Sequence, residues 1–144
     1  KPKIDDRYHK KNIVSHDQNS FEAIVIDNTQ EILHQAKDAD VVGIDEGQFM
    51  GMGLVEVVNT LAAAGKRVII AGLDMDYLGN PFPPIPELMA IAEHVQKEHA
   101  ICVVCGNPAN YSQRVVPEED LIAVGSTGMY EARCRLHFVK PKEI

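Results

Sequence analysis

The sequence lacks several features that would mark whole classes of protein. It has no apolar stretch approaching the ~20 residues that a membrane-spanning helix needs, so we expect no membrane partner. It lacks an excess of basic residues, and its net charge of −7 argues against a nucleic-acid partner, which would require a basic patch. Internal repeats and low-complexity tracts are absent as well. A chain of 144 residues with 45% hydrophobic residues fits one globular domain, with or without a small appendage.

Cysteine is scarce, and a count of three excludes complete pairing into disulfides within the chain. A reduced, cytoplasmic environment with thiolates on a metal ion explains this number better. Two cysteines stand in Cys102-Val103-Val104-Cys105 and the third in Cys134-Arg135-Leu136-His137. Two such ligand pairs match the spacing of a closed, structural zinc site. The alternative, three ordinary buried cysteines and an unrelated histidine, would have to produce this pattern by chance.

A zinc ion on Cys102, Cys105, Cys134 and His137 would have a geometric consequence. It would join the two ends of the segment Gly106–Arg133 and offset part of the entropy lost when a loop of that length closes. We therefore expect this segment to be a loop with fixed ends that can fold over a ligand.

The first two-thirds of the chain alternates strand and helix signals, which predicts α/β architecture with a largely parallel sheet. The expected strands are Ala23–Ile26, Val41–Ile44 and Val68–Leu73; the expected helices are Glu31–Lys37, Leu54–Ala64 and Glu87–His94; the proline-rich Asp76–Pro86 is expected to be a loop. Asn28 and Thr29 offer a cap for the first helix, and Gly65 a stop for the second. Beyond Cys102, short alternating segments indicate a small β-rich zinc lobe. We expect an α/β core over residues 1–100 and the zinc lobe over residues 101–144.

An acidic pair, Asp45-Glu46, directly follows the apolar run Val41–Ile44. The run resembles the strand of a Walker B element in P-loop phosphotransferases, and ligands of such sheets bind beyond the carboxyl ends of the strands. An aspartate there can hold magnesium, and a neighbouring glutamate can accept a proton from an attacking hydroxyl. Taken alone the pair is weak evidence, because many strands end in acidic turn residues.

The phosphate loop of such enzymes, Gly-x-x-x-x-Gly-Lys-Ser/Thr, does not occur in residues 1–144. Gly65-Lys66-Arg67 is no substitute, because it follows a helix and precedes a strand, which is the reverse order. The chain also opens with Lys1 and not with Met, so we expect it to be part of a longer protein.

Several motifs in one order resemble the type II (cytosolic-type, zinc-containing) thymidine kinases. They are Ile44-Asp45-Glu46-Gly47-Gln48-Phe49, then Gly72-Leu73-Asp74-Met75-Asp76-Tyr77, then Asn80-Pro81-Phe82, then the two ligand pairs. Lys3–Tyr8 and Val14–Asp17 also resemble the early part of that family. The resemblance runs from Lys1 to about Val139.

The resemblance implies a P-loop NTPase-like fold and ATP-dependent phosphorylation of the 5′-hydroxyl of thymidine, in pyrimidine nucleoside salvage for DNA synthesis. It implies that Glu46 is the general base, and that Mg²⁺ and ATP lie near Asp5, Asp6, Arg7, Asp45, Gly47 and Gln48. The implied nucleoside contacts are Phe49, Leu73, Tyr77, Phe82, Ser112, Leu121, Ile122, Ala123, Val124, Gly125 and Tyr130. The implied assembly is a cytoplasmic homotetramer with structural zinc.

The chain departs from the family at four points. Tyr77 stands where many relatives carry Phe, and His137 where many carry Cys, although histidine still binds zinc. Met50–Gly53 follows Phe49 where a second aromatic is common. The fourth departure is the absence of the phosphate-loop motif from residues 1–144. Without this motif, we expect residues 1–144 alone not to phosphorylate thymidine.

Two other functions remain as alternatives at this stage. One is a zinc-ribbon interaction module, which would usually carry clustered basic residues, whereas Pro117-Glu118-Glu119-Asp120 is acidic. The other is a different P-loop enzyme or a catalytically inactive regulator that keeps the acidic strand end.

Overall fold

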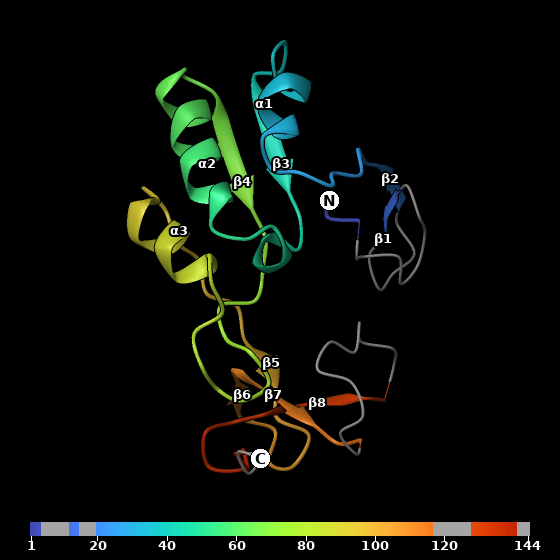
Figure 1. The fold of residues 1–144 in the computed structure, drawn as a ribbon. Coiled ribbons are helices and arrows are strands. Elements are labelled where there is room, and N and C mark those ends of the chain that lie inside the picture. The colour runs from blue at the N-terminus through green and yellow to red at the C-terminus, as the bar shows by residue number, and fades with distance from the viewer. Residues whose placement is uncertain (4–11, 15–19, 117–127, 141–144) are drawn as a thin grey trace. The chain divides into compact units, whose positions relative to one another are not determined.

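The computed structural model describes residues 1–3, 12–14, 20–116 and 128–140. The chain divides into two compact units, and Figure 1 shows the elements of each. The first unit comprises Lys1–Asp74 and Pro83–Ile91, and the second comprises Met75–Phe82 and Ala92–Ile144. The boundary near residue 100 expected from the sequence stays a prediction.

The first unit is a mixed α/β structure. Its elements are β1 (Asn12–Val14), β2 (Ser20–Glu22), α1 (Glu31–Gln35), β3 (Val41–Ile44), the 3₁₀ turn η1 (Gly47–Phe49), α2 (Gly53–Ala63), β4 (Arg67–Ile70) and α3 (Ile85–Ile91). β1 and β2 pair antiparallel, whereas β3 and β4 pair in parallel with Ile44 opposite Ile70. Within the described residues the parallel sheet has these two strands. The α/β class is thus confirmed, with a small parallel sheet.

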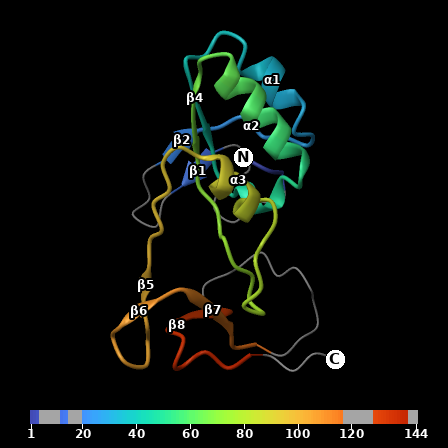
Figure 2. The same cartoon turned by 90° about the vertical axis from the view of Figure 1, so that its left-hand side faces the viewer.

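The core of this unit lies between the parallel pair and α2, which runs beside β4 in Figures 1 and 2. The apolar positions of α2 recur at helical spacing, so one face of the helix is buried. That face consists of Leu54, Val57, Val58 and Leu61, of which Leu54 and Val57 are 0% exposed. Ile44 and Ile85 belong to the same core.

The C-terminal end of α2 confirms the prediction that this helix stops at Gly65. Gly65 adopts a φ of +81°, a conformation that favours glycine. Its N–H donates to the carbonyl of Ala62 at 2.9 Å, and that of Lys66 donates to Leu61 at 3.2 Å. This pair of hydrogen bonds satisfies carbonyls that the helix would otherwise leave without a partner.

The predicted strand Ala23–Ile26 is wrong. Of these four residues, only Ile26 takes part in a β-bridge, which it forms in parallel with Pro2. The described segment that lies opposite Ile26 is short and consists of residues 1–3. Ile26 exchanges hydrogen bonds with Lys1 and Lys3, the residues on either side of Pro2, as the geometry of a parallel bridge requires. The cap also differs: Gln30 occupies the N-cap of α1 without a side-chain cap, while Asn28 Oδ1 accepts from Gln30 N at 2.9 Å.

The third helix also differs from its predicted bounds. It begins at Ile85, two residues before the predicted Glu87, because a proline in the first turn gives up an N–H that the helix would leave unpaired anyway. It ends at Ile91 and not at His94, because the residues from Ala92 to Ala100 are exposed and have no face to bury. Likewise β4 ends at Ile70 and not at Leu73, where its partner β3 ends too.

The second unit is β-rich. It contains the antiparallel pairs β5 (Ala100–Ile101) with β6 (Pro108–Ala109), and β7 (Tyr111–Arg114) with β8 (Tyr130–Arg133). The loop Met75–Phe82 belongs to it and is closed by a bridge between Met75 and Pro81. Asp76 Oδ1 organises this loop by accepting hydrogen bonds from Leu78 N and Asn80 N at 2.9 and 2.8 Å.

Among the described residues, no helix combines the length and the apolar character that crossing a bilayer requires.

Candidate functional site

The acidic strand end lies at the carboxyl edge of the parallel pair. Since Ile44 and Ile70 are register partners, the residues after β3 and after β4 emerge at the same edge. The backbone stays linked beyond the strands: Ala71 N donates to Ile44 O at 2.9 Å, and Gly47 N donates to Ala71 O at 3.0 Å. Asp45 and Glu46 therefore stand where open α/β sheets bind ligands.

Glu46 adopts an unusual backbone conformation. Its φ of 54° and ψ of 43° place it in the left-handed region, which few residues other than glycine occupy. Its N–H donates to Asp45 Oδ1 at 3.0 Å, so the pair is held together at the turn. A strained residue of this kind often marks a functional position.

The buried side chain of Gln48 links Glu46 to the residues after β4. Its Nε2 donates to Glu46 Oε2 at 2.6 Å, and its Oε1 accepts from Leu73 N at 3.0 Å. Gln48 is 3% exposed, whereas the side chain of Leu73 is half exposed. The resemblance assigns Glu46 to catalysis, Gln48 to ATP or magnesium and Leu73 to thymidine, and the structure links these three by hydrogen bonds within the first unit.

The four predicted metal ligands also lie together. Their ligand atoms all fall within 4.8 Å of one another. The Sγ atoms of Cys105 and Cys134 are 3.7 Å apart, and His137 Nδ1 lies 3.3 Å from Cys134 Sγ and 3.9 Å from Cys102 Sγ. A tetrahedral zinc with bonds of about 2.3 Å to sulfur has sulfur–sulfur edges of about 3.8 Å. These three cysteines and one histidine therefore fit a tetrahedral zinc ion.

Local turns bring each ligand pair together. In the first pair, Gly106 N donates to Cys102 O at 2.9 Å, and the φ of Gly106 is +74°. In the second, His137 N donates to Cys134 O at 3.0 Å. Such turns point both side chains of a pair toward one position, as zinc binding requires.

The sulfur environment favours a bound cation. Burial alone would raise the pKa of Cys102, but backbone hydrogen bonds from Cys134, Val104 and Cys105 outweigh it and lower that pKa to about 6. For Cys105, a backbone hydrogen bond from Asn107 lowers the pKa, but burial and the sulfurs of Cys102 and Cys134 raise it overall. One thiolate thus resists the formation of the next, and a divalent cation would remove that conflict.

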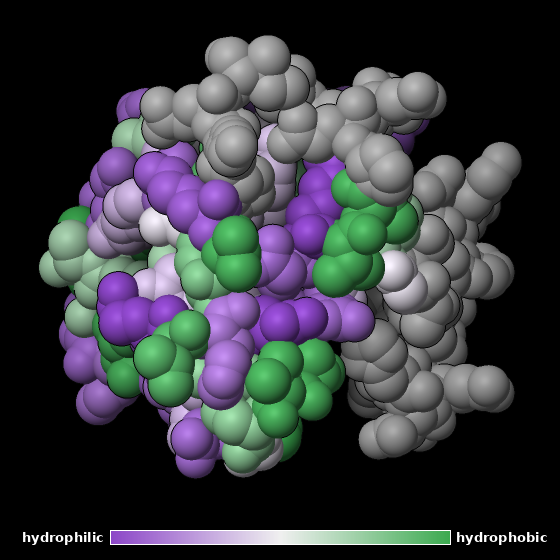
Figure 3. Space-filling view, turned by 90° about the horizontal axis from the view of Figure 1, so that it is seen from below, coloured by the Kyte–Doolittle hydropathy of each residue, from purple (hydrophilic) through white to green (hydrophobic). Residues whose placement is uncertain are grey.

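The surface near the ligand pairs carries exposed apolar side chains, among them Val103, Val104 and Leu136. In the view from below, hydrophobic residues alternate with hydrophilic ones and do not merge into one patch (Figure 3).

Comparison with known proteins decides the family. The family model described as thymidine kinase matches residues 1–138. The thymidine kinase of Rhodothermus sp. (strain ITI 518) is 51% identical over 142 residues, which cover 99% of this chain and 67% of the relative. The chain belongs to the thymidine kinase family. The resemblance seen in the sequence is thereby confirmed, and the Cys/His cluster agrees with its zinc-containing type.

The predicted nucleoside contacts of this family member fall in both units. Phe49 and Leu73 belong to the first unit, and Tyr77, Phe82, Ser112 and Tyr130 belong to the second. Asp5, Asp6 and Arg7, and the run Leu121, Ile122, Ala123, Val124 and Gly125, lie outside the described residues.

In the second unit, three of the predicted contacts lie near one arginine, Arg114. Ser112 faces Ala132 and Arg114 faces Tyr130 across the β7–β8 pair, so Ser112, Arg114 and Tyr130 share one face. The guanidinium of Arg114 also lies over the Tyr77 ring. Arg114 was not among the predicted contacts, although a position two residues after Ser112 on a strand indicates that the two side chains share a face.

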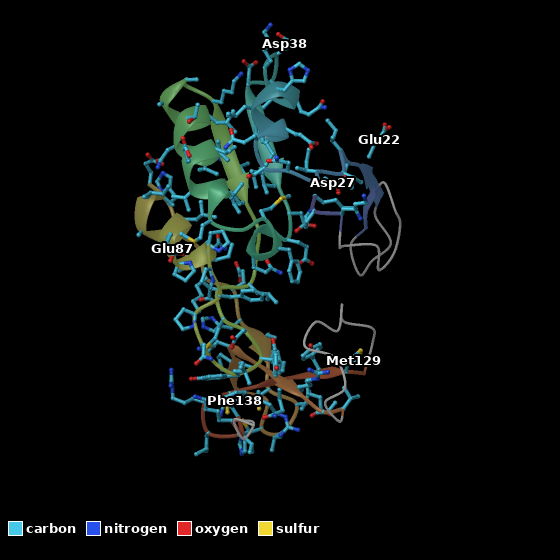
Figure 4. All side chains as sticks on the ribbon, viewed as in Figure 1. Glu22, Asp27, Asp38, Glu87, Met129 and Phe138 are labelled. Atoms are coloured by element: carbon cyan, nitrogen blue, oxygen red, sulfur yellow. The ribbon has the colours of Figure 1, made fainter. Side chains whose placement is uncertain are left out.

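The Cys/His cluster connects to the loop that carries Tyr77. Phe138, which follows His137 and is labelled in Figure 4, stacks on Tyr111 with ring centroids 4.4 Å apart. A Cβ at Gly79 would lie 3.1 Å from the Phe138 ring and 3.4 Å from the Tyr111 ring. The loop Met75–Phe82 thus packs against aromatic residues that adjoin the metal ligands.

Proposed function

We propose that this protein transfers the γ-phosphoryl group of ATP to the 5′-hydroxyl of thymidine, with Glu46 as the general base. The observation that carries the proposal is the place of Asp45-Glu46 at the carboxyl edge of the β3–β4 pair, in a chain of the thymidine kinase family. This edge is where phosphotransferases of the P-loop type hold their nucleotide. We infer that the unit has that fold.

Glu46 accepts the proton of the thymidine 5′-hydroxyl while the oxygen attacks the γ-phosphorus. A bond forms between the 5′-oxygen and phosphorus, the bond from phosphorus to the β–γ bridging oxygen breaks, and ADP leaves. The proton stays on the Glu46 carboxylate until it passes to solvent. Correct placement of that carboxylate is the contribution of this chain to the chemical step.

Asp45 is the residue that would hold Mg²⁺, since carboxylate oxygen is the ligand that this ion prefers. When bound, Mg²⁺ neutralises negative charge on the phosphates. Asp5, Asp6, Arg7, Gly47 and Gln48 are the other residues that the resemblance assigns to ATP.

The proposed nucleoside contacts follow the resemblance. From the first unit they are Phe49 and Leu73; from the second they are Tyr77, Phe82, Ser112 and Tyr130, with the main chain of Leu121–Gly125 reading the thymine edge. The half-exposed side chain of Leu73 is available to an apolar ligand group.

We propose a structural role for zinc on Cys102, Cys105, Cys134 and His137, because four protein ligands leave no open position for catalysis. The family resemblance further suggests a cytoplasmic homotetramer that acts in pyrimidine salvage. Sedimentation of the purified protein would test the oligomeric state.

The substrate is tested by binding and by product analysis. Thermal shifts of residues 1–144 with thymidine, deoxycytidine, deoxyadenosine and deoxyguanosine should show stabilisation by thymidine alone. Because residues 1–144 contain no Gly-x-x-x-x-Gly-Lys-Ser/Thr motif, turnover is measured on the full-length gene product with ATP and Mg²⁺. Thymidine 5′-monophosphate, identified by mass spectrometry, is the expected product. Preference for another nucleoside, or no nucleoside-dependent ADP, would refute the proposal.

A further inference from the structure

The side chain of Gln48 forms hydrogen bonds with two partners inside the protein. It lies in η1 and is 3% exposed, so its amide has little access to solvent. The amide nitrogen Nε2 donates to Glu46 Oε2 at 2.6 Å, and the amide oxygen Oε1 accepts from Leu73 N at 3.0 Å. A buried amide with both ends hydrogen-bonded is held in one orientation.

The orientation of that amide follows from its partners. The Leu73 backbone N–H can only donate, so the amide oxygen of Gln48 must face it. The Nε2 group then faces Glu46, and it can only donate. Oε2 of Glu46 is therefore the acceptor of this hydrogen bond.

The backbone around Gln48 is shaped for this contact. A Cβ at Gly72 would lie 2.9 Å from Gln48 Oε1 and 2.6 Å from Ile85 Cδ1, so a side chain there would displace one or both of them. Glu46 itself is in the left-handed region, where residues other than glycine are rare. The hydrogen bond from Gln48 spans the turn from Glu46 to Gln48 and supports this conformation.

We propose that Gln48 is a positioning residue for Glu46: its amide, anchored on Leu73 N–H, fixes the direction of the Glu46 carboxylate. This role rests on the proposed function of Glu46 as general base. It differs from the contact with ATP or magnesium that the resemblance assigns to Gln48. Through Leu73, the same amide also ties the carboxylate to a residue proposed to contact thymidine.

Gln48→Glu keeps the shape of the side chain and the acceptor for Leu73 N–H, but it replaces the donor to Glu46 by a second carboxyl group that pushes the Glu46 carboxylate away. We expect kcat of the full-length gene product to fall by about 100-fold, the lower end of what a positioned general base contributes. The dissociation constants of thymidine and ATP should stay those of the wild type. Gln35→Glu, which adds the same charge on the exposed face of α1, is the matched control and should keep full activity.

Two further variants separate positioning from folding. Gln48→Met fills similar volume without charge, and it should lose kcat in the same way while far-UV circular dichroism stays unchanged. In a Glu46→Gln background, either change at Gln48 should cause no further loss, because Gln48 acts through Glu46.

The outcomes distinguish this inference from the proposed function. If the wild type makes no thymidine monophosphate, the proposed function fails and the inference fails with it. If the wild type is active and folded Gln48 variants keep their kcat, only the positioning role is refuted. A loss of ATP affinity at unchanged kcat would also refute it and assign Gln48 to ATP.

Discussion

The guanidinium carbon of Arg114 lies 5.4 Å from the centroid of the Tyr77 ring. This distance is within the range of a cation–π interaction, which contributes about 0.5–1 kcal/mol at accessible sites. Arg114 ends β7, and Tyr77 lies on the loop Met75–Phe82, so the contact joins two segments of the second unit. It fixes an aromatic ring that we propose to contact thymidine.

We predict that the ring of Tyr77, and not its hydroxyl, is needed for thymidine binding. Tyr77→Leu removes the π face and should weaken binding by roughly tenfold, an amount set by the lost aromatic surface and cation–π contact. Tyr77→Phe keeps the ring and should bind like the wild type. Isothermal titration calorimetry with thymidine measures both. Equal losses in the two variants would show that the hydroxyl carries the effect.

The close contacts of Gly72 predict a large effect of a single methyl group. Gly72→Ala would force Ile85 and Gln48 to move and should destabilise the first unit by about 1–3 kcal/mol, as overpacking usually does. Gly43→Ala is the matched control, because a Cβ there has no heavy atom within 4 Å. Thermal denaturation should show a lower Tm for the first variant alone. Similar values for both would contradict the close packing of Gly72 against Ile85 and Gln48.

Metal removal should weaken the second unit and thymidine binding together. Elemental analysis should find one zinc per chain, and Cys105→Ser should lose it, since thiolate ligands hold the ion. The Tm should fall because the ligand pairs are no longer joined, and thymidine affinity should fall because the Tyr111–Phe138 stack supports the loop that carries Tyr77.

Two variants serve as controls for this prediction. His137→Cys supplies a different zinc ligand at the same position and should retain the metal. His94→Ala changes a histidine outside the cluster and should alter nothing. If Cys105→Ser keeps its zinc and its stability, the cluster is not a metal site.

The sequence predicted those features whose cause is local. The Cys/His cluster followed from ligand spacing within two short turns, and the acidic edge followed from an apolar strand that ends in Asp45-Glu46. The error at Ala23–Ile26 arose because an apolar run forms a strand only with a partner, and within the described residues only Ile26 of this run is bridged, to Pro2.

Other features could not be predicted because they depend on distant residues. The hydrogen bond from Leu73 to Gln48 joins positions 25 apart in the chain and exists only because β3 and β4 pair in this register. The left-handed conformation of Glu46 belongs to a turn whose Gly47 N–H donates to Ala71 O, beyond the end of β4. The contact of Arg114 with Tyr77 requires the loop Met75–Phe82 to fold as it does.

The exchange Glu46→Gln tests the central claim most directly, because it keeps the size of the side chain and an oxygen that can accept from Gln48. In the full-length gene product with ATP, Mg²⁺ and thymidine, we predict that kcat falls by about 10²–10⁴-fold, the usual contribution of a general base. The dissociation constant of thymidine should stay at the wild-type value. Retention of most of the wild-type kcat would remove Glu46 from the reaction and contradict the account.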